Sequence, residues 1–185
     1  MSVTAVPIRP ISRGSLPKMW AGIAALALTA GGLAWAGTRD VRIASLTNEQ
    51  FLAENGARSG IVTTPSGLQY QVLERGQGQN AKATDLALIE YKGSLRDGTV
   101  FDSSERAGGP VPLPVAGSIP GFSEGLQLMN RGARYRFWIP PELAYGDQVP
   151  PGGPIPPNAL LVFDVTLRDV QPLPPGAGAL FGGGR

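Results

Sequence analysis

The sequence predicts an α+β domain in which an antiparallel, twisted β-sheet wraps over one short α-helix, preceded by an N-terminal transmembrane or signal helix. Between residues 67 and 171, short runs of alternating apolar and polar residues are separated by Gly and Pro, which indicates strands joined by turns. Residues 121–129 carry apolar side chains at helical spacing and predict the short helix. The sequence has no repeat and no alternation of strands with long helices, so a parallel sheet is not expected.

The predicted strands follow one another with short connections. Their composition and alternation place them at residues 68–74, 86–95, 99–101, 111–115, 134–139 and 160–170. The Asp97-Gly98 pair predicts a turn between the second and third strands. Prolines interrupt residues 111–115 and restrict that strand to an edge of the sheet. Residues 140–158 are dense in Pro and Gly and are expected to form a loop.

A short helix is predicted inside a linker, residues 39–66, that precedes the domain. Thr47 has the side chain of a helix N-cap, and Gln50 lies three residues later, where a capping box places Glu or Gln. Gly56 is suited to end this helix after about two turns. Residues 63–67 are expected to be loop or extended chain.

The N-terminal region has the pattern of a membrane-targeting element. A basic segment, residues 1–18, precedes 20 residues without a charged side chain, residues 19–38. A helix of that length spans about 30 Å, the thickness of a bilayer's hydrocarbon core, and the basic flank favours a cytoplasmic start. Three interpretations stay open: an uncleaved signal anchor, a signal peptide cleaved after Ala34-Trp35-Ala36, or a buried helix. The first two export the domain, most simply to the bacterial periplasm, and the anchor would tether it to the inner membrane.

The composition excludes several classes of function. The 185 residues contain no Cys and no His, which removes disulfides, thiolate or imidazole metal ligands, and Ser-His or Cys-His catalytic pairs. We expect neither a metal nor a cofactor. Residues 43–171 carry ten basic and thirteen acidic side chains, so the pI of about 9.2 reflects the N-terminal region and no nucleic-acid partner is expected. Residues 172–185 are rich in Pro and Gly and are expected to be a disordered tail.

Four blocks of the domain carry a resemblance. They are IEYKGSLRDGTVFDSS (89–104), SIPGFSEGLQLM (118–129), PPELAYG (140–146) and IPPNALLVFDV (155–165). In order and spacing these blocks resemble the FKBP-type peptidyl-prolyl cis-trans isomerases, over about residues 67–171. The preceding residues 51–73 are similar to the bacterial members related to the macrophage infectivity potentiator.

The resemblance implies an FKBP-like fold and an enzyme that rotates X–Pro amides in unfolded or newly exported proteins. No covalent bond breaks in that reaction, so a chain without His can catalyse it, and an apolar pocket favours the less polar twisted amide. By resemblance, Phe122 is the floor beneath the prolyl ring, and the Ile119 backbone N–H and the Tyr145 hydroxyl bind substrate carbonyls. The other implied positions are the aromatic walls Tyr91, Phe101 and Phe163, the carboxylate Asp102, and the substrate-binding Val111 and Ile155.

Two positions depart from the family pattern. Phe122 stands where Trp is usual, and Val111 stands where an aromatic residue is common. A second hypothesis therefore stays open, a non-catalytic periplasmic chaperone or proline-peptide-binding module that uses the same groove. The family also implies macrolide inhibitors as ligands.

Residues 43–60 have room for one short helix and no dimerisation arm, so a monomer is expected. Asp102, beside aromatic walls, is expected to have a Tyr or Arg partner.

Overall fold

The computed structural model describes residues 46–149 and 151–173. The predicted segments 1–18 and 19–38, and residues 174–185 of the predicted tail, lie outside these described residues. Within the described part of the chain, no helix has the length and apolar character needed to span a bilayer.

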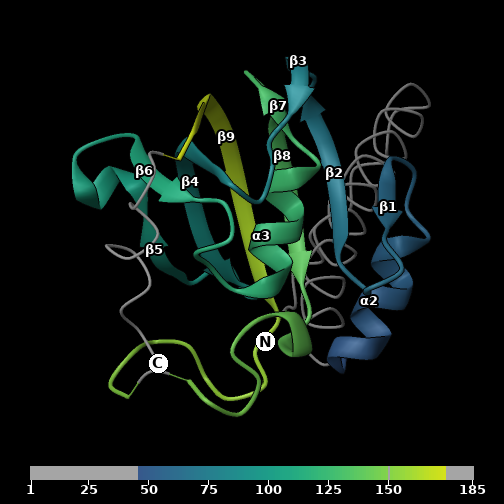
Figure 1. Cartoon of the computed structure of the whole chain (residues 1–185). Coiled ribbons are helices and arrows are strands. Elements are labelled where there is room, and N and C mark those ends of the chain that lie inside the picture. The colour runs from purple at the N-terminus through teal and green to yellow at the C-terminus, as the bar shows by residue number, and fades with distance from the viewer. Residues whose placement is uncertain (1–45, 150, 174–185) are drawn as a thin grey trace, which may run out of the picture. The chain divides into compact units, whose positions relative to one another are not determined.

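An antiparallel sheet of seven strands forms the body of residues 46–149 and 151–173 (Figure 1). Its strands lie in the order β1-β2-β8-β9-β4-β5, and β6 pairs with β4 as well. Every pairing is antiparallel, which confirms the predicted sheet. The strands are β1 Ile61–Thr63, β2 Gln69–Glu74, β4 Asp85–Leu95, β5 Val100–Ser103, β6 Val111–Pro114, β8 Arg134–Ile139 and β9 Leu161–Pro172.

Helix α3 (Pro120–Gln127) crosses one face of this sheet and packs against β8 (Figure 1). Gly125 permits the close approach, because a Cβ there would lie 2.8 Å from the ring of Phe137. The hydrophobic core lies between α3 and the sheet, and it contains the three apolar residues that predicted the helix, Phe122, Leu126 and Met129.

Helix α2 (Asn48–Gly56) has the predicted capping box. The Gln50 backbone N–H donates to Thr47 Oγ1 at 3.2 Å, and the Thr47 N–H donates to Gln50 Oε1 at 3.0 Å. The helix ends at Gly56, but the cap that follows is right-handed, so the glycine is not needed there for a positive φ. It is needed for space, because a Cβ would lie 2.8 Å from Nε2 of Gln69 on β2.

Three parts of the fold were not predicted. Strand β1 continues the sheet beyond β2, and a separate two-stranded sheet joins β3 (Gln77–Asn80) to β7 (Asn130–Arg131). Strand β9 runs to Pro172, one residue into the predicted tail. None of these segments has the alternation of apolar and polar side chains that indicates a strand.

Candidate active site

An aromatic pocket opens between β4, β5, β9 and the start of α3. Its cavity measures about 270 Å³. Eight of the nine predicted site residues line it, and they are Tyr91, Phe101, Asp102, Val111, Ile119, Phe122, Tyr145 and Phe163. The sheet therefore gathers residues from widely separated parts of the chain around one cavity with room for a small ring.

The aromatic side chains contact one another in a chain of tilted and edge-to-face pairs. Phe163 is the hub: its ring centroid lies 4.9 Å from that of Phe122, 5.5 Å from that of Phe101 and 6.3 Å from that of Tyr91. Phe122 and Phe163 are nearly buried, with exposed fractions of 4% and 7%. Such pairs resist displacement, because edge-to-face contacts add about 0.5–1.5 kcal/mol each beyond the burial of area. The pocket is thus a fixed apolar surface.

Asp102 has the partner that its surroundings predicted. The Tyr91 hydroxyl donates to Asp102 Oδ2 at 2.6 Å, and the Ser103 backbone N–H donates to Oδ1 at 2.8 Å. Burial raises the pKa of Tyr91 well above its usual range, and the hydrogen bond to Asp102 raises it further. The phenol therefore stays protonated, and the carboxylate holds Tyr91 in place with both of its oxygens occupied.

Two hydrogen-bond donors at the pocket are available to a ligand. Within the described part of the chain, neither the Ile119 backbone N–H nor the Tyr145 hydroxyl donates to another protein group. Pro120 occupies the first helical position and has no N–H of its own. Ile119, the N-cap residue before it, has one. Tyr145 is 37% exposed, which leaves its hydroxyl open to solvent or substrate. A substrate carbonyl can accept from either group.

The predicted residue Ile155 is not brought to the pocket wall; it is half-buried and packs against the hydrophobic core. Sequence reasoning missed four lining residues, Ile89, Leu113, Gly117 and Ser118. The first two carry a signal that was available: each lies two positions from a predicted residue on the same strand, and such residues share a face. The other two belong to the loop before α3, where no periodicity applies.

Glu124 on α3 has a hydrogen-bond partner in the fold. Ser66 Oγ donates to its Oε2 at 2.7 Å, which ties the connection between β1 and β2 to α3. Sequence spacing carries no signal for this contact, because the two residues lie 58 positions apart.

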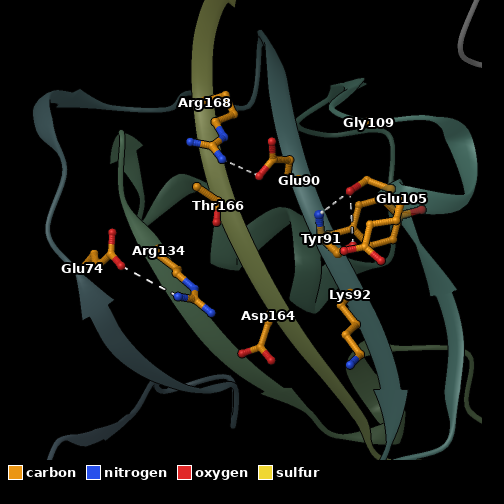
Figure 2. Close-up of a pocket in the computed structure, with 11 residues that line it drawn as sticks. Glu74, Glu90, Tyr91, Lys92, Glu105, Gly109, Arg134, Asp164, Thr166 and Arg168 are labelled. Atoms are coloured by element: carbon orange, nitrogen blue, oxygen red, sulfur yellow. Dashed lines mark hydrogen bonds and ion pairs between the residues drawn. The ribbon is translucent and has the colours of Figure 1, made fainter.

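A second cavity, of about 640 Å³, opens on the opposite face of β4 (Figure 2). Glu90 and Lys92 line it, because side chains alternate along a strand and theirs leave the face opposite to that of the Tyr91 side chain; Tyr91 and Ser104 border this cavity as well. Ion pairs occupy its wall, with Arg168 2.6 Å from Glu90 and Arg134 3.8 Å from Glu74. Charges of both signs alternate here in contact with water, so this cavity does not suit an apolar ring. The aromatic pocket is the better candidate for a proline.

Comparison with known proteins agrees with this geometry. Residues 77–168 match the family model of the FKBP-type peptidyl-prolyl cis-trans isomerases, and residues 40–72 match the domain amino terminal to that isomerase. The crystal structure of FkpA from Escherichia coli superposes with a TM-score of 0.66 at 35% identity, covering 89% of this chain and 75% of that one. The chain belongs to the FKBP-type peptidyl-prolyl cis-trans isomerase family. The resemblance seen in the four sequence blocks is confirmed.

Curated members of the FKBP family are similar over the same region. A probable FKBP-type peptidyl-prolyl cis-trans isomerase FkpA of Neisseria meningitidis is 50% identical over 119 residues, which is 64% of this chain and 43% of that protein. The outer membrane protein MIP of Legionella longbeachae is 45% identical over 123 residues, which is 66% of this chain and 52% of that protein. The chain therefore spans about half the length of these curated relatives.

Proposed function

We propose that this FKBP family member is a peptidyl-prolyl cis-trans isomerase that acts on X–Pro bonds of unfolded or newly exported proteins. The observation that carries the proposal is the convergence of eight predicted residues on one aromatic pocket. Membership in the isomerase family supports the same activity. The proposed roles are Phe122 as floor, Tyr91, Phe101 and Phe163 as walls, and Ile119 and Tyr145 as donors.

The proposed mechanism needs no proton transfer. Rotation about an X–Pro amide meets a barrier of about 18–20 kcal/mol, and the twisted amide is less polar than the planar one because conjugation is lost. A pocket of buried aromatic rings favours that state relative to water, while the Ile119 N–H holds a carbonyl of the substrate. Asp102 contributes by holding Tyr91 through the 2.6 Å hydrogen bond.

The test is a protease-coupled isomerisation assay of the full chain with Leu-Pro and Phe-Pro peptides. We expect the cis-to-trans conversion to be faster than the uncatalysed background, which takes tens of seconds. A rate equal to background across a series of peptides would contradict the proposal.

The second candidate, a non-catalytic proline-peptide-binding module, is favoured by Phe122 and Val111 at positions where the family pattern differs. It predicts peptide binding without acceleration.

Tyr145→Phe is expected to lower kcat/KM by the equivalent of at most about 1–2 kcal/mol, the scale of one hydrogen bond. The loss is limited because the hydroxyl lies on a side chain that is 37% exposed, where water competes for it. The measurement is kcat/KM for a Leu-Pro peptide, with circular dichroism to establish that the variant is folded. A larger loss would give this hydroxyl a role beyond one hydrogen bond.

The activity is expected to vary little between about pH 6 and 8. The chain contains no His and no Cys, whose ordinary pKa values lie in or near that range. The pKa of Tyr91 is raised by burial, so its folded state favours the protonated form. The contribution of this pKa shift to the stability of the folded state is fully present below about pH 10, the pKa of an unfolded tyrosine. It is lost only as the pH rises above that value. A bell-shaped profile of kcat/KM centred between pH 6 and 8 would show that a shifted carboxyl takes part.

The proposed location is the periplasm, with a tether to the inner membrane through residues 19–38. The uncharged length of that segment and its basic flank support this proposal. In cell fractionation, the native chain is expected to stay with membranes after high-salt and alkaline washing, with residues 39–185 accessible from the periplasmic side. A native protein whose N-terminal sequence begins at Gly37 would show cleavage and overturn the tether.

A further inference from the structure

The backbone ladder of β4 is interrupted beside the aromatic pocket. Strand β9 pairs with β4 from Asp85 to Leu95, whereas the other edge of β4 is shared by two short strands. Strand β6 pairs with it up to Ile89, and β5 pairs with it from Lys92 onward. Tyr91, a wall of the pocket, therefore lies in a gap where no strand pairs with this edge.

The side chain of Ser104 fills that gap. Its hydroxyl accepts a hydrogen bond from the Tyr91 backbone N–H at 3.1 Å and donates to the Tyr91 carbonyl at 3.4 Å. These contacts are the dashed lines beside Tyr91 in Figure 2. One hydroxyl thus replaces both backbone partners that a neighbouring strand would supply. Ser104 is only 3% exposed, so in the folded protein its hydroxyl and not bulk water meets these backbone groups.

We infer that Ser104 is a positioning residue for the isomerase, and that it acts on substrate through Tyr91. This inference rests on the proposed function. Tyr91 is held at two ends by one short stretch of chain: Asp102 accepts from its hydroxyl at 2.6 Å, and Ser104 binds its backbone. The ring between these two anchors faces Phe122 and Phe163, with centroids 6.3 Å away in both cases.

The consequence is that the wall formed by Tyr91 needs both anchors. If Ser104 lost its hydroxyl, the Tyr91 N–H and C=O would have no partner in the gap, and the strand could shift or admit water. The Asp102 anchor would then fix the end of the ring, and the pairing with Val165 on β9 would hold the Tyr91 backbone from one side only. A shifted wall weakens the contact of the pocket with the prolyl ring without removing any group that touches the substrate.

The experiment compares Ser104→Ala with Ser103→Ala in the full chain. Ser103 is a matched control, because it is adjacent, buried to a similar degree, and makes no capping hydrogen bond with its side chain. NMR hydrogen exchange of the Tyr91 amide is expected to be about tenfold faster in Ser104→Ala, the scale of one hydrogen bond, and unchanged in Ser103→Ala. We expect kcat/KM to fall about tenfold in the first variant and less than about twofold in the second.

A double-mutant cycle separates positioning from a general loss of stability. In a Tyr91→Ala background, Ser104→Ala is expected to change kcat/KM by less than about twofold, because no ring is left to misplace. An equal tenfold loss in both backgrounds would overturn the inference. Ser104→Thr, which keeps the hydroxyl, is expected to restore slow exchange at Tyr91, and unchanged exchange in Ser104→Ala would also overturn it. A wild-type chain without activity would overturn the proposed function instead, while Tyr91 exchange and the affinity for an X–Pro peptide would still decide the role of Ser104.

Discussion

Phe101→Ala is expected to lower kcat/KM for an X–Pro peptide about a hundredfold, which corresponds to about 2.7 kcal/mol of transition-state binding. Phe101 is a half-buried wall of the pocket, and its ring meets Phe163 edge to face at a centroid distance of 5.5 Å. Its removal opens the cavity to water on one side, and water favours the planar, more polar amide over the twisted one. The measurement is the protease-coupled isomerisation rate at several enzyme concentrations.

A control variant, Tyr135→Ala, measures the general effect of losing an aromatic side chain outside the pocket. Tyr135 is also half-buried, and it stacks on Tyr70 at 5.7 Å, outside the aromatic pocket. Tyr135→Ala is therefore expected to cost stability while the folded protein keeps its kcat/KM. Circular dichroism must show that both variants are folded. If folded Phe101→Ala retained full activity while Tyr145→Phe lost it, the apolar-pocket mechanism would be wrong.

Much of the fold was predictable because its signals are local. The capping box at Thr47 depends on side chains three residues apart, and the strands around Tyr91 and Phe163 depend on alternation along one segment. The small sheet of β3 and β7 was not predictable in this way. Its residues 77–80 are fully polar or glycine, and their partners lie about fifty positions away, so no nearby pattern marks them.

The candidate site was predicted by resemblance and not by periodicity. Taken singly, an aromatic residue such as Phe163 in a strand is more often part of a core, and only its place within the four blocks pointed to a pocket. The tyrosine partner of Asp102 was expected, but the contact of Ser104 with Tyr91 could not be predicted. Ser104 reaches the backbone of Tyr91 across the end of a strand pairing, and that geometry exists only once β5 and β6 share one edge of β4. Ile155 shows the converse, since a matching motif did not bring the residue to the pocket.

Gly93→Ala is expected to lower kcat/KM about as much as the loss of Phe101, and to lower the free energy of unfolding by about 1–3 kcal/mol, the usual cost of overpacking. Gly93 lies on β4 between the two aromatic walls, and it is the register partner of Phe163 on β9. A Cβ at this position would lie 2.7 Å from the ring of Phe101 and 2.8 Å from that of Phe163. Both rings would have to move apart, so one methyl group changes two walls of the pocket at once.

Gly56→Ala is the control for this prediction, because its added Cβ would meet a neighbour equally closely but far from the pocket. There the neighbour is the Gln69 amide at 2.8 Å, in the contact between α2 and β2. Both variants are measured by thermal unfolding and by kcat/KM corrected for the folded fraction. Gly56→Ala is expected to affect stability alone, whereas Gly93→Ala is expected to lose activity in the folded protein. Full activity in folded Gly93→Ala would mean that the spacing of Phe101 and Phe163 does not govern catalysis, and the assignment of these rings as walls would have to be abandoned.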